Sequence, residues 1–239
     1  MGVIQGAKDR ARAEVASAIK DQARTQLAAE GAARLSLRAV ARELGMASSA
    51  LYRYFPSRDD LLTALIIDAY DTLGLAAESA FERAGTADPL HAWTEVCQAV
   101  RDWTLDHPHE YALIYGSPVP GYAAPQDTVA PASRVALVLL AVAQAAHAAG
   151  ALVEPDLPGT DCDAVVADDV RQLLRQPEHT LPQGVAPRLA AVWAQLFGLI
   201  SFEVFGQFHR VVDDRATLFE KTVLVLAHQV GLRPVGAGA

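Results

Sequence analysis

Hydroxyl-bearing and charged side chains are concentrated in one short stretch of the sequence, ASSALYRYFPSRDDLL. On a helical projection, Ser48, Ser49 and Tyr52 lie on one face. Tyr54 and Arg58 follow at the end of that segment. Hydroxyl and guanidinium groups at this density are suited to hydrogen bonding with base edges and phosphate oxygens. A structural interpretation stands beside this one, because tyrosines often pack half-buried and a Ser-Ser pair often begins a helix.

The elements that carry this cluster form a pattern of two short helices joined by a tight turn. Ser36 is an N-cap candidate before an apolar stripe, and Gly45 can end that helix in the left-handed conformation. A second helix can run over residues 48–55, because the proline that follows disfavours helical geometry at the residue before it. The pattern predicts a helix-turn-helix over about residues 36–55, with the second helix presented to a DNA major groove.

Two longer helices flank this motif. Residues 8–30 are Ala-rich and lack proline, and Gly31 can stop them. Ser57 can cap a long helix over residues 58–84. We therefore predict a first domain at residues 1–58, followed by a linking helix.

The remainder also shows helical periodicity, and no alternating run typical of a strand occurs. We predict an all-α protein of about nine to ten helices, with a larger second domain at residues 85–239. Its helices are expected at residues 88–107, 109–115, 131–149, 187–212 and 215–230. Residues 151–185 contain many prolines and acids, which favours an irregular segment with one short helix at 164–174.

Charge is divided unevenly along the chain. The whole sequence carries −8, but the first 58 residues hold ten basic and five acidic side chains, and the other 181 residues therefore carry −13. A basic head on an acidic body indicates that a nucleic acid, if bound, is bound by the head. The two cysteines match no zinc or redox spacing, and the N-terminus lacks a signal-peptide pattern. We expect a cytoplasmic protein that does not enter the membrane.

The stretch LSLRAVARELGMASSALYRYFPSRDDLLTAL resembles the DNA-binding domain of TetR-family transcriptional regulators. The resemblance covers about residues 8–70 and implies a homodimer that binds near-palindromic double-stranded operator DNA. Arg58 stands where Lys is more usual, which keeps the charge, and Ala47 implies sparse base readout. The DNA contacts implied are Ser36, Arg38, Ala47, Ser48, Ser49, Tyr52, Tyr54 and Arg58.

The C-terminal part looks like a subclass of that family named for a Trp-His-Gly signature. Phe197 replaces its His before Gly198, so no role of that His is carried over. Two late apolar helices are the expected dimer-forming pair, with Gly198 and Gly206 allowing close approach of a second backbone. The predicted dimer-interface residues are Leu196, Leu199, Phe202, Leu218 and Val225.

A small-molecule effector pocket is the usual second function of the resembled family. Each candidate aromatic has ordinary core packing as its alternative. Glu203 is a carboxylate in an apolar helix and needs a partner, which is a ligand, a helix terminus or an Arg. The candidate ligand-binding residues are Trp93, Trp103, Tyr111, Tyr115, Tyr122, Trp193, Phe197 and Glu203.

Patterns typical of catalysis or metal binding do not occur. The seven histidines form no HExxH motif, phosphate-binding and nucleophile-elbow motifs are missing, and the acids at residues 161–169 lack the calcium-loop pattern. We therefore predict no enzymatic activity, no catalytic residue, no metal and no cofactor. The sequence favours a ligand-responsive regulator, most simply a repressor. The alternative is a helical small-molecule carrier without specific DNA binding.

Overall fold

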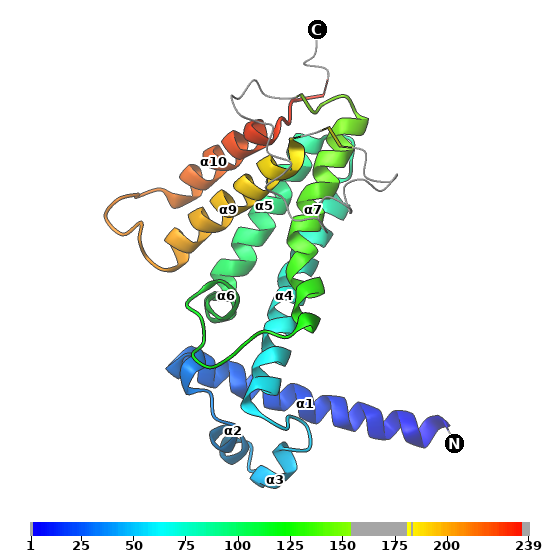
Figure 1. The fold of residues 1–239 in the computed structure, drawn as a ribbon, viewed down its shortest axis with the longest axis vertical. Helices are drawn as coiled ribbons and strands as arrows, with labels where there is room; N and C mark the ends of the chain where they lie inside the picture. Colours follow the sequence, from blue (N-terminus) through cyan, green and yellow to red (C-terminus); the bar gives the residue numbers. More distant parts are fainter. Residues whose placement is uncertain (1, 154–180, 183, 236–239) are drawn as a thin grey trace. The chain divides into compact units, whose positions relative to one another are not determined.

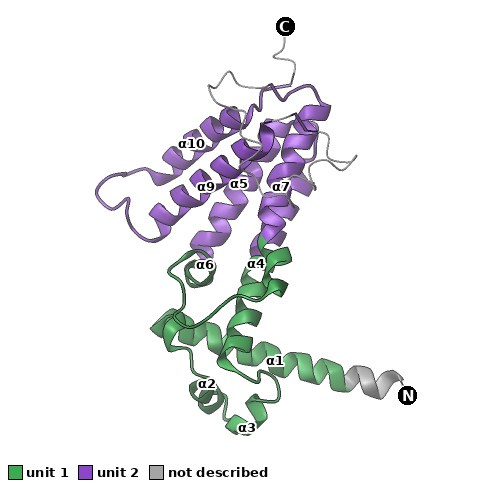
Figure 2. Ribbon diagram, viewed as in Figure 1, with its two compact units in different colours: residues 1–71, 107–132 green, residues 72–106, 133–239 purple. Residues whose placement is uncertain are grey.

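The computed structural model describes residues 2–153, 181–182 and 184–235, and these are helical apart from turns, loops and one isolated bridge between Leu152 and Leu232 (Figure 1). They divide into two compact units (Figure 2). Unit 1 comprises residues 1–71 and 107–132, and unit 2 comprises residues 72–106 and 133–239. The all-α prediction is confirmed within the described ranges.

Unit 1 begins with α1 (Gly2–Glu30) and a short 3₁₀ turn (Ala32–Arg34), followed by α2 (Leu37–Glu43) and α3 (Ser48–Leu51). The first part of α4 (Arg58–Ala84), predicted as a linking helix after the head, packs on the core of the head through Leu61, Leu62 and Leu65. Apolar side chains from these helices form one core, and Ile19, Val40 and Leu51 are almost fully buried in it. The core holds α2 and α3 against α1 and α4 and so sets the position of the polar cluster.

Unit 1 also contains a segment from beyond the predicted head. This segment is α6 (Pro108–Tyr115), the loop after it and a 3₁₀ turn (Gln126–Thr128). Leu113, Val119 and Tyr122 pack against the head core, and the hydroxyls of Thr63 and Tyr122 lie 2.9 Å apart. The predicted domain boundaries do not anticipate this grouping.

Unit 2 is built from the second part of α4, α5 (Pro89–Asp106), most of α7 (Val129–Ala148), α9 (Val185–Val204) and α10 (Arg215–Val230). Among its described helices, α10 packs on both α9 and α5. Trp93, Val142, Leu196 and Phe219 belong to the buried core of this unit. The indole Nε1 of Trp93 donates to the Val223 carbonyl at 3.1 Å, which joins α5 to α10.

Three predicted helix limits are wrong by four or more residues. α1 begins at Gly2 rather than at residue 8, and α3 ends at Leu51, four residues before the predicted end. The predicted helix at 187–212 ends at Val204, because Gly206 takes a left-handed φ of 80° and turns the chain. The helix predicted at 164–174 and the acids at 161–169 lie outside the described residues.

Two described helical segments, Gln126–Ala148 and Val185–Val204, are long and apolar enough to cross a membrane. This is weak evidence for a span, because the core helix of a soluble protein meets the same criterion. In α9, Leu196 and Ile200 are fully buried within the chain. Packing in the core accounts for this side of the helix, whereas Trp193 and Phe202 on the same helix are exposed.

Candidate DNA-binding site

The turn between α2 and α3 has the geometry of a helix-turn-helix. The Ser36 hydroxyl accepts a hydrogen bond from the Ala39 backbone N–H at 3.4 Å and caps α2. Gly45 has a φ of 64°, which lets the Met46 backbone N–H return to the Ala41 carbonyl at 2.8 Å. The sequence predicted both the cap and the turning glycine.

The recognition helix α3 is oriented by its apolar side. Leu51 is fully buried and Phe55 is 9% exposed, so both face the core of unit 1. Ser48 and Ser49 are exposed, and Tyr52 is 41% exposed. Two of the predicted DNA contacts, Ser48 and Ser49, therefore lie on the surface of one short helix, and Tyr52 is exposed directly after it. Arg38 and Ala47 are exposed as well.

Tyr54 is half-buried at the end of this motif, and α1 holds it there. The Arg12 guanidinium lies 5.3 Å from the centre of the Tyr54 ring, within the range of a cation–π contact. The same guanidinium donates to the Arg53 carbonyl at 3.2 Å. α1 thus contacts the end of the recognition segment directly, which the sequence did not reveal.

Arg58 has a role within unit 1 that sequence reasoning missed. Its guanidinium donates to the carbonyls of Leu35 at 3.2 Å, Ala32 at 2.9 Å and Ala33 at 3.3 Å. Asp59 lies 3.4 Å from it. A planar fork of five donors can serve several carbonyls at once, whereas an ammonium cannot match this geometry. Its predicted phosphate contact remains a prediction.

A residue of α1, Gln26, also holds the segment that leads into α2. The Gln26 side-chain oxygen accepts from the Ser36 backbone N–H at 3.2 Å, and its amide nitrogen lies 3.5 Å from the Arg34 carbonyl. Gln26 and Arg58 together hold the segment leading into α2. In the sequence, Gln26 is visible only as a polar residue within the apolar stripe of α1. Its contacts with Ser36 and Arg34 are established only by the fold.

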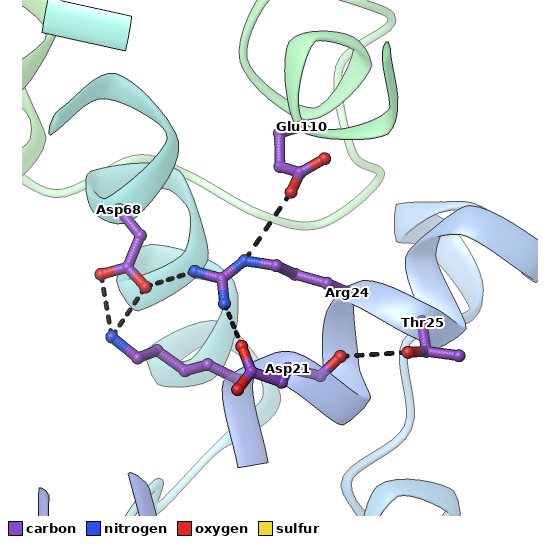
Figure 3. A network of polar contacts seen from close by, with 6 residues as sticks. Asp21, Arg24, Thr25, Asp68 and Glu110 are labelled. Atoms are coloured by element: carbon purple, nitrogen blue, oxygen red, sulfur yellow. Dashed lines mark hydrogen bonds and ion pairs between the residues drawn. The ribbon is translucent and has the colours of Figure 1, made fainter. Parts of the chain in front are cut away.

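A charged network joins α1, α4 and α6 within unit 1 (Figure 3). The Arg24 guanidinium lies 2.6 Å from Asp68, 2.7 Å from Asp21 and 3.8 Å from Glu110. Lys20 lies 2.7 Å from a carboxylate oxygen of Asp68. The close-up shows Arg24 reaching from α1 toward carboxylates on three helical segments. These contacts tie α6 to α1 and α4, the two long helices of unit 1.

The aromatic ligand candidates of unit 1 form contacts among themselves. The Tyr111 and Tyr115 rings are stacked with centres 5.1 Å apart, and Tyr70 meets Tyr115 edge-on at 6.1 Å. Burial raises the pKa of Tyr115 well above its usual range. Tyr111 is fully buried, so its ring contributes to core packing, and the ligand-binding role of Tyr111 and Tyr115 remains a prediction.

In unit 2, the structure answers the question raised by Glu203. Its carboxylate accepts two hydrogen bonds from Arg101, at 2.8 and 2.6 Å. Glu203 therefore has the Arg partner that the sequence analysis named as an alternative, and its role as a ligand anchor remains a prediction. Trp93 and Phe197 are buried, whereas Trp193 is 36% exposed with its ring centre 5.6 Å from that of Phe197. Trp103 is 7% exposed.

A groove of about 630 Å³ lies in unit 2 along the C-terminal half of α7. None of the predicted ligand-binding residues lines it. Its described walls are Thr86, Ala141, Gln144, Ala145, His147, Ala148 and Ala149. Across the described ranges, no group of three or more His, Cys, Asp and Glu side chains is placed to hold a metal ion.

The predicted dimer residues of α9 and α10 differ in exposure. Leu196 is fully buried within the chain and offers no side-chain surface to a second copy. Phe202 and Val225 are 52% and 55% exposed, while Leu199 and Leu218 are half-buried. Sequence reasoning missed three further exposed apolar side chains on or next to these helices, namely Trp193, Phe205 and Leu224.

The fold and exposed α3 define a helix-turn-helix protein, and comparisons with known proteins agree. Residues 19–65 match the model described as "Bacterial regulatory proteins, tetR family", and residues 93–226 match "Tetracyclin repressor-like, C-terminal domain". The HTH-type transcriptional regulators Rv1816 of Mycobacterium tuberculosis H37Rv and Mb1846 of Mycobacterium bovis are each 39% identical over 229 residues. These matches cover 92% of this chain and 94% of each relative.

Solved structures show the same likeness. The crystal structure of SCO4313 superposes with a TM-score of 0.72 at 35% identity, covering 92% of this chain and 98% of the other. PfmR from Thermus thermophilus shares the fold, with a TM-score of 0.54 at 18% identity over 89% and 96% of the two chains.

The chain belongs to the TetR family of bacterial regulatory proteins. It is a DNA-binding, ligand-responsive transcriptional regulator, and the predicted absence of enzymatic activity agrees with this non-enzymatic family. The carrier alternative does not fit this membership. The Trp-His-Gly subclass remains a prediction.

Proposed function

We propose that the protein is a cytoplasmic homodimeric repressor that binds near-palindromic operator DNA and is released by a small apolar effector. The observation that carries this proposal is the exposed polar face of α3 together with the residue that follows it. Ser48, Ser49 and Tyr52 present hydroxyls to solvent, while Leu51 and Phe55 anchor the same segment in the core. A short helix held in this way can enter a major groove without losing its packing.

The contacts around α3 support assigned roles for its residues. Ser48 and Ser49 stand at the N-terminus of the helix, the part that reaches base edges in a helix-turn-helix. We assign Tyr52 and Arg38 to phosphates, because both are exposed and lie on the two helices of the motif or directly after them. The Ser36 hydroxyl caps the N-terminus of α2, two residues before Arg38, and we assign it a phosphate as well.

Dimerisation supports the DNA-binding proposal, because one four-residue recognition helix makes few contacts. The exposed face of α9 carries Gly198 and Phe202 one turn apart, and among the described residues a Cβ at Gly198 would meet nothing within 4 Å beyond its own helix. On α10, Leu224 and Val225 are exposed. We propose that these faces from two subunits form a four-helix bundle, in which Gly198 permits close approach of the second backbone.

We propose an apolar effector because several polar side chains of unit 2 already have hydrogen-bond partners within the protein. Arg101 and Glu203 satisfy each other, and the Trp93 indole is bonded to a backbone carbonyl. A charged effector would have to displace such pairs at high cost. The aromatic residues Trp193 and Phe197 instead offer apolar contact, and the match to a tetracyclin repressor-like domain supports the regulatory role.

The experiment is a fluorescence-anisotropy titration of the full-length protein with the duplex upstream of its own gene, across a salt series, and with scrambled DNA. We expect selective binding that weakens steeply with salt. The variant Tyr52→Phe should keep the fold and lose about 3-fold to 10-fold in affinity, since it removes one exposed hydroxyl. Tyr70→Phe, on α4 away from α3, is the matched control and should bind as wild type.

Equal binding to scrambled DNA would contradict the proposal for that duplex. A selection from random-sequence duplexes then provides a second test, and failure to enrich any sequence would overturn the repressor assignment.

A further inference from the structure

The first turns of α1 project beyond the rest of unit 1. Figure 1 shows the N-terminal end of α1 continuing past α2 and α3. Residues 8–14 are all exposed, and Ile19 is the first fully buried side chain among residues 8–30 of the helix. Core packing therefore does not explain this projecting segment, which we call the α1 arm (residues 8–14).

The arm carries its basic residues on a particular face. At about 100° per residue, Lys8 and Arg12 both lie within about 20° of the direction of Ile19, whereas Arg10 lies about 180° away. Ile19 points into the core shared with α2 and α3. Lys8 and Arg12 thus lie on the same side of α1 as its buried residues. They lie in the part of the helix that extends beyond the core, and we call this pair the basic strip.

Arg12 gives direct evidence for the direction of that strip. Its guanidinium bonds to the Arg53 carbonyl and lies over the Tyr54 ring, immediately after α3. Lys8 lies one helical turn farther out, about 6 Å along the axis. The nearby acids point elsewhere, because Asp9 is about 80° and Glu14 about 140° from the Ile19 direction.

On the proposed DNA-binding function, we propose that the α1 arm is a second DNA contact, with Lys8 binding a backbone phosphate of the duplex flanking the half-site read by α3. Arg12 positions the arm against the recognition segment. The step of about 6 Å beyond Arg12 corresponds to roughly two phosphates along one strand, which are spaced about 3.4 Å along the duplex axis. The contact is with phosphate and carries no base specificity.

The chain offers a charge-matched control for this proposal. Lys8→Gln and Arg10→Gln each remove one positive charge within the same two turns, but on opposite faces. Both positions are exposed, so neither change removes core packing. A general effect of net charge would weaken DNA binding equally in the two variants, whereas the proposal requires a difference.

The test uses the full-length dimer and a duplex that the wild-type protein selects from a random pool. The duplex is prepared in a short form, ending at the selected sequence, and in a long form with about ten more base pairs, one helical turn, on each side. We expect Lys8→Gln to bind the long duplex about 3-fold to 10-fold more weakly than wild type, with a salt slope lower by about one per subunit. Arg10→Gln should remain within about twofold of wild type, and on the short duplex all three proteins should bind alike.

Two results would overturn the arm contact alone: wild-type affinity of Lys8→Gln on the long duplex, or equal losses in both variants. Failure of the wild-type protein to select any duplex would overturn the DNA-binding proposal itself. The two failures are therefore distinguishable.

Discussion

Arg101 on α5 and Glu203 on α9 form a two-point ion pair in unit 2, with nitrogen–oxygen distances of 2.8 and 2.6 Å. Their side chains are only 10% and 9% exposed, and the Arg101 guanidinium lies 5.1 Å from the centre of the Phe219 ring on α10. The hydrogen bonds from Arg101 to Glu203 raise the pKa of Arg101, so the guanidinium remains charged. One buried pair thereby fixes the relative placement of three helices.

Replacing only one partner of this pair should destabilise the protein more than replacing both partners. Glu203→Leu leaves Arg101 buried without its carboxylate and should cost about 3–5 kcal/mol of unfolding free energy. The double variant Arg101→Met, Glu203→Leu removes both charges and should recover most of that loss. Urea denaturation at one protein concentration measures the unfolding free energies of the single and the double variant. Additive losses in the double variant would contradict the proposed coupling.

Arg58→Lys should be harmful although it keeps the charge. A lysine cannot serve the three carbonyls of Leu35, Ala32 and Ala33 that the guanidinium serves, and we expect a loss of about 1–3 kcal/mol. Hydrogen exchange of the backbone N–H groups in α2 reports the local effect. Arg38→Lys, the same substitution at an exposed position on α2 itself, is the control. Wild-type exchange in Arg58→Lys would show that the carbonyl contacts do not hold the segment.

The proposed dimer surface can be tested by adding charge to it. Val225→Asp places a carboxylate on an apolar face that the proposed bundle buries, and should shift sedimentation at micromolar concentration from dimer to monomer. Val211→Asp is the matched control, because Val211 is 74% exposed in the turn after α9 and lies outside the proposed helix pair. Dimers of unchanged stability in Val225→Asp would place the subunit interface elsewhere.

Asp214 gives a pH-dependent contribution to stability. Its carboxylate accepts hydrogen bonds from the Thr217 hydroxyl at 2.6 Å and the Thr217 backbone N–H at 3.0 Å, which lowers its pKa below the usual 3.8. A lowered pKa in the folded state stabilises the protein above pH 3.8, and this contribution is lost as pH falls through the lower folded value. The melting-temperature difference between wild type and Asp214→Ala should therefore be full at pH 6 and shrink toward pH 3. Asp213→Ala removes the same charge next to the cap and should show no comparable change.

Local rules were sufficient for much of the helix-turn-helix. Ser36 as an N-cap, Gly45 as the turning residue and Leu51 as an inward apolar residue each depend on neighbours within a few positions in sequence. Such short-range preferences can be inferred from the sequence alone, and the same residues belong to the stretch that resembles the TetR family. The end of α3 was misplaced because the residues after Leu51 form turns that also keep Phe55 on the core.

Residue types and spacing by themselves determined the all-α class, the basic head, the helix-turn-helix and the need of Glu203 for a partner. Tertiary structure alone decided which partner that was, that Arg58 bonds to carbonyls 23 to 26 positions away, and that α6 belongs with unit 1. It also decided that Leu196 is core while Phe202 is surface, although both lie on the same apolar helix. The physical reason is range: caps and turns are satisfied by near neighbours in the chain, whereas a guanidinium, a carboxylate or an apolar helix face is satisfied by whatever the fold brings beside it.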